Sequence, residues 1–268
     1  LDATTGAAAV NVLTGDHVIA APLGLVDPTN LAFSSATDSL TLGGTVSGGG
    51  GLAKSTAGDL VLSGSNTFTG GIDFTQGTLT FANGGLGQGT YLSLADATLV
   101  WAAGNIQDIS NRAVVVGGTS VTFNTNGNDV TLMNPIGESG TGMMVKAGAG
   151  TLALGEAATH TGGTTISEGT LQLGIGGATG GVVGDITDNA TLAVNLEGGA
   201  SLANRVTGTG SLVHAGSGAL TLPLLAAANT FSGTTTVLYA GSTLVLEDAL
   251  ALQNSTWATA ADGGGGAV

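Results

Sequence analysis

Residues 51–81 decide the fold of this chain, and they read GLAKSTAGDLVLSGSNTFTGGIDFTQGTLTF. The same pattern returns without a gap 92 positions later, and a third copy begins at Gly210. The residues that match between the first two copies are Leu52, Lys54, Gly58, Leu60, Leu62, Thr67, Thr69, Gly70, Gly71, Gly77, Thr78 and Leu79 in the first, and Met144, Lys146, Gly150, Leu152, Leu154, Thr159, Thr161, Gly162, Gly163, Gly169, Thr170 and Leu171 in the second. Copying of one unit is typical of solenoid proteins. We therefore predict repeat units near 48–81, 140–173 and 208–246.

The spacing between basic residues indicates that the units belong to a coil. Arg112 and Lys146 are 34 positions apart, whereas the matching pair, Arg205 and His214, is only nine apart. The difference of 25 residues is close to one turn of a parallel β-solenoid, whose repeats take roughly 20 to 30 residues. A coil can lose a whole turn and keep the register of the others, and we expect matched copies to lie at the same corner.

The composition agrees with many short strands. Gly accounts for 49 of 268 residues, and charged residues for only 8 %. Apolar and polar residues alternate in segments such as 59–62 and 151–154, which is the pattern of strands, and no window shows the 3.6-residue period of a helix. We predict a single all-β parallel β-solenoid over residues 1–268, with 11 or 12 turns and little or no α-helix. With about 4.8 Å between turns, the rod would be roughly 55 Å long. Leu60, Leu62 and Leu79 are predicted to form interior columns.

The first copy resembles the autotransporter-associated β-strand repeat, which occurs in passenger domains of bacterial autotransporters and in other large bacterial surface proteins. The residues that carry the resemblance are Gly51, Leu52 and Lys54, then 58–64, 66–71 and 77–79, together with the upstream segment 15–23. The resemblance implies a right-handed parallel β-helix that is exported to the cell surface or beyond. It implies little about activity, because the repeat is a scaffold in adhesins, filaments and stalks. The second copy departs from the pattern at Ala158 and His160, and the third has a three-residue insertion near 223–228.

Charge and cysteine content exclude several classes of protein. The net charge is −14 with only four basic residues, so nucleic acid and anionic membrane surfaces are not expected partners. The chain has no cysteine, which excludes disulfides and thiolate metal sites. No run of about 18 apolar residues indicates a membrane span. The sequence opens on Leu1 and shows no signal peptide, so we expect a mature or excised segment.

Candidate catalytic patterns have simpler structural interpretations. Residues 48–55 come close to a phosphate-binding loop, but Ala53 stands where that loop needs glycine and no helix follows, so Lys54 is interpreted as a lysine at a corner of the coil. Arg112 and Arg205 each follow an asparagine, Asn111 and Asn204, which favours a structural hydrogen bond to a turn. The acidic pairs, Asp185 with Asp188 and Glu247 with Asp248, are interpreted as solvated, with weak surface calcium binding as the alternative.

Histidine and aromatic residues also give no convergent site. His17, His160 and His214 are scattered, and His160 and His214 occupy different repeat positions, so no metal set or catalytic triad is predicted. Trp101, Trp257, Tyr91 and Tyr239 are candidates for a sugar-stacking platform, with core or end-covering roles as the alternative. Phe68 and Phe231 are predicted to stack inside the coil or along a corner. Asn66 and Asn229 are expected to align, with Ala158 interrupting the amide ladder.

We therefore identify no catalytic, cofactor-binding or metal-binding residue, and the chain is predicted not to be an enzyme. The predicted function is that of a secreted bacterial structural protein at the cell surface or outside the cell: a fibre or filament subunit, or the stalk of an adhesin. Neither terminus shows an evident cap, since 1–12 looks like a further turn and 263–268 like the start of another strand. Head-to-tail association with itself, or continuation into further repeats of the same rod, is therefore expected. The alternative is a β-helix that binds host or matrix glycans or cleaves a polysaccharide.

Overall fold

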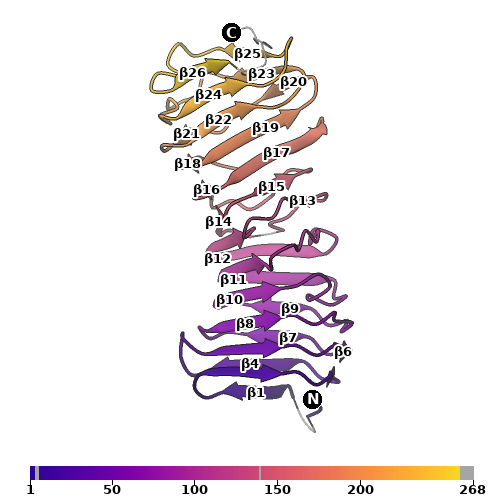
Figure 1. Cartoon of the computed structure of the whole chain (residues 1–268). Helices are drawn as coiled ribbons and strands as arrows, with labels where there is room; N and C mark the ends of the chain where they lie inside the picture. The colour runs from indigo at the N-terminus through magenta and orange to yellow at the C-terminus, as the bar shows by residue number, and fades with distance from the viewer. Residues whose placement is uncertain (4–5, 139, 260–268) are drawn as a thin grey trace.

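The protein is a parallel β-solenoid of about 12 turns. The computed structural model describes residues 1–3, 6–138 and 140–259, which form 26 strands and no helix, and therefore no helix that could span a membrane. Every strand pairing within these ranges is parallel, and the strands stack along one long axis (Figure 1). The predicted fold class, number of turns and lack of helix are confirmed. The right hand of the coil remains the expectation from the family resemblance.

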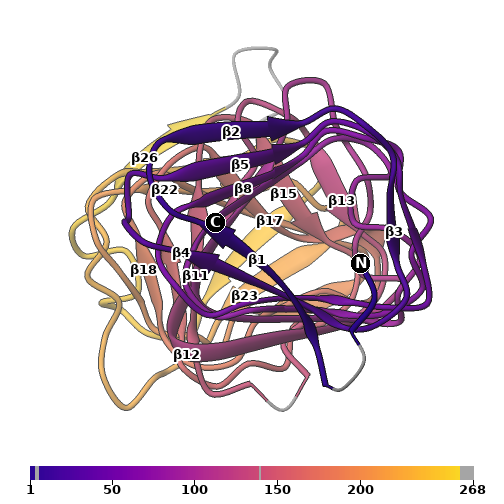
Figure 2. The same cartoon turned by 90° about the horizontal axis from the view of Figure 1, so that it is seen from below.

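The coil has three faces, which are visible when the molecule is seen along its axis (Figure 2). The first face starts with β1 (Ala8–Val12), β4 (Thr29–Phe33), β7 (Leu52–Lys54), β9 (Ile72–Phe74) and the first halves of β11 (Tyr91–Trp101) and β12 (Ala113–Asn124), and ends with β20 (Gly199–Ser201), β23 (Ala219–Leu222) and β25 (Thr243–Leu246). The second face contains β2 (Asp16–Ile19), β5 (Ser39–Leu42), β8 (Asp59–Leu62), β10 (Gly77–Phe81), the second halves of β11 and β12, β14 (Met143–Ala147), β16 (Thr164–Ile166), β18 (Ile186–Asp188) and β21 (Val206–Thr207). The third face contains β3 (Leu23–Leu25), β6 (Val46–Gly48), β13 (Val130–Leu132), β15 (Thr151–Leu154), β17 (Thr170–Gly177), β19 (Thr191–Leu196), β22 (Ser211–His214), β24 (Thr234–Val237) and β26 (Thr256–Thr259).

Interior columns of side chains hold the turns together. Leu60 lies between Leu40 and Leu79 in the ladder, and Leu62 lies beside Phe81, so the predicted columns are confirmed. All of these side chains are buried. Each buried leucine contributes about 1.5–3 kcal/mol to the stability of the fold relative to an exposed one.

Large aromatic rings fill the coil where its strands are longest. Trp101, at the end of β11, packs between Phe81 and Phe123, with ring centroids 5.3 and 6.3 Å away. Its indole Nε1 donates a hydrogen bond to the carbonyl oxygen of Gln107 at 2.9 Å. Trp101 is therefore a core residue and cannot belong to a sugar-binding platform.

Matched copies of the repeat do not lie at the same corner, and this expectation was wrong. Leu60 is on the second face in β8, whereas its counterpart Leu152 is on the third face in β15, paired with Val130 and Leu171. In the third copy the corresponding strand, β23, is on the first face. Each successive copy is thus advanced by one face around the axis.

The register gives the physical reason for this offset. Leu52 pairs with Ile72, which pairs with Leu92, and Leu92 pairs with Val114. The amide of Gly137 bonds to the carbonyl of Val114, so the chain completes four turns at Ile136. Met144 comes eight residues later, when the chain has reached the next face. The spacing of 92 residues is four turns and one face, rather than a whole number of turns.

The one-turn difference between copies is confirmed. Between Arg112 and Lys146 the chain makes one complete turn and then advances by one face, whereas Arg205 and His214 are separated by the advance of one face alone. The predicted first turn is also present, because β1 pairs with β4. The predicted strand at 263–268 lies outside the described residues.

Candidate functional site

The basic residues of the coil point inward or along its corners. Lys54 ends β7, and alternation along this short strand sends its side chain inside, where only 1 % of it is exposed. Its Nζ donates hydrogen bonds to the carbonyl oxygens of Thr56 and Gln76, and lies 4.6 and 4.7 Å from the ring centroids of Phe33 and Phe74. Burial lowers the pKa of Lys54 to about 8, and Asp59 opposes this shift. The interpretation as a corner lysine is confirmed.

The second copy repeats this arrangement around Lys146. Its buried Nζ donates to the carbonyl oxygens of Ala147, Gly148 and Glu168 at 3.0, 2.6 and 3.0 Å. Burial lowers the pKa of Lys146 to about 8, against the opposing charges of Glu168 and Asp129. In the third copy the buried His214 takes this position, and its Nε2 lies 2.9 Å from the carbonyl oxygen of Gly218.

The two arginines also bond to turn carbonyls, as predicted. Arg112 is buried, and its Nη1 and Nη2 donate to the carbonyl oxygens of Leu86 and Gly87 in the preceding turn at 3.0 and 3.2 Å. Burial lowers the pKa of the Arg112 guanidinium. Arg205 instead reaches the following turn, where its Nε donates to the carbonyl oxygen of Ala228 at 3.2 Å. All four basic residues thus hold the main chain of the coil.

The acidic pair at 185 and 188 is not a solvated pair, and this prediction was wrong for Asp188. The side chain of Asp185 is 69 % exposed, whereas Asp188 is fully buried. Ile186 and Asp188 face inward because they alternate with Thr187 along β18. Burial raises the pKa of Asp188 to about 6, although its carboxylate accepts hydrogen bonds from the backbone amides of Ala190 and Leu192.

Among the described residues, the partners of the Asp188 carboxylate are backbone amides and not a second carboxylate. Its Oδ2 is buried and has no hydrogen-bond partner within the described residues. The other pair agrees with the prediction only in part: Glu247 is exposed, whereas Asp248 is half-buried and accepts a hydrogen bond from the amide of Leu250. In the described part of the chain, no three His, Asp or Glu side chains gather as metal ligands would.

The three histidines lie apart, as predicted. His17 is exposed near the N-terminal end, and His214 lies on the third face. His160 is buried, and its Nε2 lies 3.1 Å from the hydroxyl of Thr164. Burial lowers the pKa of His160, and a hydrogen bond from its ring to the carbonyl group of Gly163 opposes this shift, so the ring is neutral at pH 7. It fills the interior position that Phe68 and Phe231 occupy in the other copies.

The advance by one face also separates residues that the sequence appeared to align. Phe68 and Phe231 are both buried, as predicted, but they lie on different faces and do not stack on each other. Asn66 and Asn229 each accept a hydrogen bond from the amide of the preceding turn, Val46 and Val206, at 2.8 Å. They therefore play the same role on different faces, and the expected alignment was wrong.

The other aromatic candidates are divided between the two halves of the coil, and Tyr239, which is 55 % exposed, follows β24 in the C-terminal half. Tyr91 lies against Gly71 on the first face, in the N-terminal half of the coil. Trp257 lies in β26, at the C-terminal end of the third face. These two exposed rings are thus far apart along the axis (Figure 1) and do not form one platform.

Comparisons with known proteins agree with the three copies of the repeat. Residues 52–81, 144–173 and 212–246 match the family model described as Passenger-associated-transport-repeat. The chain carries three passenger-associated-transport repeats. These repeats confirm the resemblance to the autotransporter repeat family, and they imply secretion to the cell surface.

A longer match extends beyond the repeats themselves. The chain is 32 % identical over 205 residues to the "Adhesin BmaC autotransporter" of Brucella suis biovar 1 (strain 1330). The match covers 75 % of this chain but only 6 % of that protein, so the chain spans a small part of its relative's length. No solved structure matches the chain significantly. The chain is therefore a passenger-type repeat region related to an adhesin.

The sequence analysis missed two features of the coil, the burial of Asp188 and the exposure of Arg205. The burial of Asp188 was recognisable from the sequence, because residues two apart in a strand point to the same side and Ile186 is apolar. The exposure of Arg205 had no such signal, because Arg112 occupies the matching repeat position and is buried. Arg205 also differs from Arg112 in its partner, which is the carbonyl oxygen of Ala228 at the end of the inserted loop that follows β23.

Proposed function

We propose that this region is a rigid rod within a secreted adhesin, where it holds adhesive surfaces away from the bacterial cell. The observation that carries the proposal is the uninterrupted coil that joins all three passenger repeats. The name of the related protein supports an adhesive role. The hydrogen bonds of the four basic side chains support a mechanical one, because they tie successive turns together at the corners.

Retention of coated beads tests the adhesive role. Beads that carry the folded chain are passed over epithelial cells, immobilised matrix proteins and immobilised glycans, and compared with beads that carry the variant Leu60→Asp Leu152→Asp, which disrupts the interior columns. We expect retention of the folded chain on at least one surface, at several times the level of the variant. Equal retention of both on every surface would contradict an adhesive role for this region.

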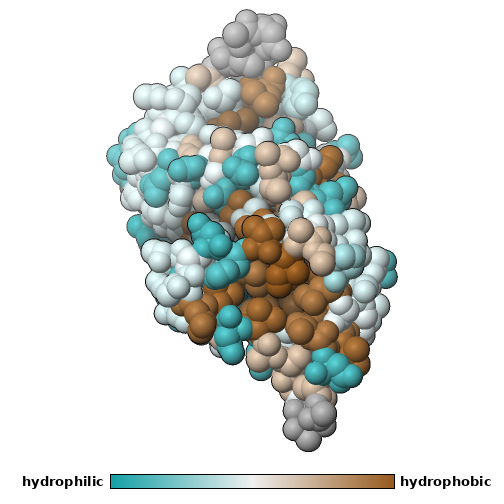
Figure 3. Space-filling model, turned by 60° about the horizontal axis from the view of Figure 1, so that its bottom comes forward, coloured by the Kyte–Doolittle hydropathy of each residue, from teal (hydrophilic) through white to brown (hydrophobic). Residues whose placement is uncertain are grey.

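We further propose that another turn of β-solenoid packs on the N-terminal end of the coil. This turn comes either from a second copy of the chain or from further repeats of the same rod. Figure 3 shows a hydrophobic patch on this end. A pocket of about 550 Å³ lies there, lined by Val10, Val12 and Ile19 among others, and Leu13 and Val18 are strongly exposed. Within the described residues, β1, β2 and β3 each pair along one edge only. Such edges favour addition of a strand.

Sedimentation over a range of concentrations tests the head-to-tail form of this proposal. The wild-type chain is expected to associate as its concentration rises, because burial of the apolar end is favourable. The variant Leu13→Lys Val18→Lys places charges on that end and should remain monomeric. Leu224→Lys, which changes an exposed leucine on a distant loop, is the matched control. A wild-type chain that stays monomeric throughout would contradict head-to-tail assembly.

A further inference from the structure

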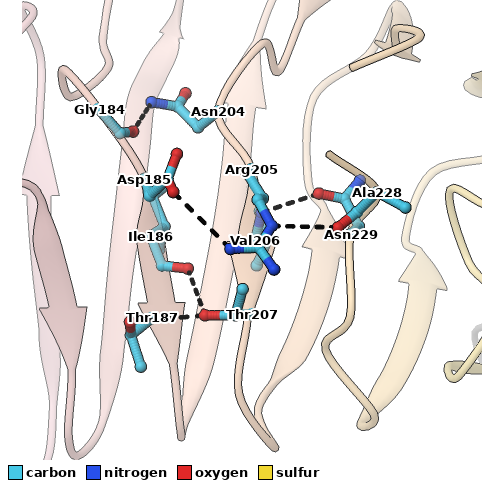
Figure 4. A network of polar contacts seen from close by, with 10 residues as sticks. All are labelled: Gly184, Asp185, Ile186, Thr187, Asn204, Arg205, Val206, Thr207, Ala228 and Asn229. Carbon is cyan, nitrogen blue, oxygen red and sulfur yellow. Dashed lines mark hydrogen bonds and ion pairs between the residues drawn. The ribbon is translucent and has the colours of Figure 1, made fainter. Parts of the chain in front are cut away.

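Arg205 differs from the other three basic residues of the protein in its exposure. Its side chain is 36 % exposed, whereas the side chains of Lys54, Lys146 and Arg112 are buried. The bond from Nε to the carbonyl of Ala228 fixes the direction of the guanidinium (Figure 4). Nη1 lies 3.9 Å from the Asp185 carboxylate, beyond hydrogen-bond distance, and neither Nη atom has a hydrogen-bond partner among the described residues. One oriented cation is thus left with two free donor groups in a protein of net charge −14.

This cation lies in a pocket beside the loop that is inserted in the third copy of the repeat. The pocket measures about 300 Å³ and is lined by Asp185, Ala203, Arg205, Leu225, Ala226 and Ala227. Its outer wall is the inserted loop, residues 223–228, in which every residue is apolar and Leu224 is 72 % exposed. In repeat proteins, insertions into single repeats map to loops on one face, which is often the binding face.

We propose that this pocket binds the carboxylate of a glutamate or aspartate in a peptide segment of a protein partner. The planar Nη1 and Nη2 groups match the two oxygens of a carboxylate, and this pairing is stronger beside apolar walls than in open water. Leucine and alanine side chains of the loop would contact apolar residues that flank the acid. The lining contains neither an aromatic ring nor a hydroxyl group, which favours a peptide over a sugar acid. This inference rests on the proposed role in adhesion.

Asp185 acts in this arrangement as an internal competitor for the guanidinium. Its loose pairing at 3.9 Å and its high exposure mean that displacement costs little, since exposed ion pairs are weak. The negative charge of the whole protein opposes an acidic partner at long range, but it is screened beyond about 8 Å at physiological ionic strength. The site is therefore a short-range contact, whose affinity depends on Arg205 and the loop.

Titration with short peptides tests the proposal independently of cell or bead adhesion. The probe is acetyl-Leu-Glu-Leu-amide, with acetyl-Leu-Gln-Leu-amide and glucuronate for comparison, and binding is followed by NMR shifts of the Arg205 side-chain Nε–H group and by calorimetry. We expect saturable binding of the glutamate peptide and at least about tenfold weaker binding of the other two. Arg205→Gln should weaken binding by a similar factor. Asp185→Asn should tighten it several-fold, which a purely structural role of Arg205 would not produce.

Two further variants separate the loop from the rest of the surface. Leu225→Ser, which changes the leucine that lines the pocket, should weaken binding of the peptide, whereas Leu13→Ser, on the N-terminal end, should leave it unchanged. Lack of saturable binding, or binding unaffected by Arg205→Gln, overturns the proposal. Tighter binding of glucuronate than of the peptide also overturns it and assigns the pocket to sugar acids. Bead retention that survives Arg205→Gln would leave the adhesive role intact while removing this site from it.

Discussion

At the scale of single residues, the buried lysines act as clamps between turns. Lys54 bonds to the carbonyl of Thr56 in its own turn and to that of Gln76 in the next. Lys146 bonds in the same way to Gly148 and Glu168. Corners interrupt the ladder of the sheets, so these carbonyl groups lack partners within it. A long side chain with three donors can satisfy several of them at once.

The lowered pKa values of the two lysines predict that stability rises at alkaline pH. In the folded protein they lose their protons near pH 8, but in the unfolded chain only near 10.5, so the cost of burying the charges disappears as pH rises between these values. From pH 7.5 to 10, the free energy of unfolding should increase by about 2 kcal/mol for each lysine, or about 4–5 kcal/mol in total. Urea denaturation at both pH values measures this. The control Lys54→Met Lys146→Met should lack the increase, and an equal increase in both proteins would contradict the assignment.

The raised pKa of Asp188 predicts the opposite dependence in a lower range. Its protonated form is favoured in the folded protein, so its contribution to stability is present below pH 4 and is lost as pH rises through about 6. Asp188→Asn should therefore stabilise the protein at pH 7.5, by about 1–2 kcal/mol, with little effect at pH 4. Thermal melts at the two pH values provide the test. Asp185→Asn, at the exposed position nearby, should show no such pH-dependent gain.

Residue roles were predictable from sequence where a repeat position and a strand pattern agreed. Lys54 and Lys146 match within a glycine-rich corner, and this was enough to favour a structural role over phosphate binding. The charge of Asp188 suggested exposure to solvent, although its position along β18 places the side chain inside the coil. Arg205 lies beside a loop insertion, whose path a repeat pattern does not specify.

At the scale of elements, the corner lysine and a glycine one turn later form a matched pair. A Cβ atom at Gly77 would lie 2.8 Å from Nζ of Lys54 and 2.2 Å from the carbonyl oxygen of Gly58. Gly169 has the same relation to Lys146. In the third copy the shorter His214 replaces lysine, and Ser242 replaces glycine and donates a hydrogen bond to the carbonyl of Gly216 at 2.8 Å. A shorter side chain at the lysine position is therefore accompanied by a larger residue at the glycine position.

This pairing predicts unequal costs for alanine at equivalent corners. Gly169→Ala should lower the free energy of unfolding by about 2 kcal/mol or more, because the new methyl group meets main-chain oxygens and the residue has a φ of 67°. Ser242→Ala should cost only about 1 kcal/mol, the contribution of its hydroxyl hydrogen bond. Chemical denaturation of both variants measures the difference. Equal costs would show that the side chain at the lysine position does not determine the corner.

At the scale of the whole molecule, each copy of the repeat is advanced by one face around the rod. The sequence spacing showed that one stretch between basic residues is a whole turn longer than its matching stretch. It did not show that each copy is advanced by one face, because individual turns vary in length. Thr29 pairs with Leu52, 23 residues later, whereas Leu52 pairs with Ile72, only 20 residues later. The face reached after 92 residues depends on the sum of such differences, which only the ladder register reveals. Equivalent surface positions of the three copies are consequently displayed in three directions.

The register predicts which deletions the coil tolerates. Ile186 pairs with Val206, Leu192 with Leu212 and Ala200 with Leu220, so on all three faces the same turn takes 20 residues. Removal of residues 186–205 should therefore let the following turns move down by one step, and the protein should keep its β-rich circular dichroism and a cooperative melt. Removal of residues 186–195 alone deletes half a turn and would bring each later strand against the wrong face, so that variant should aggregate or unfold. A folded half-turn deletion, or an unfolded full-turn deletion, would contradict a coil whose turns are interchangeable units.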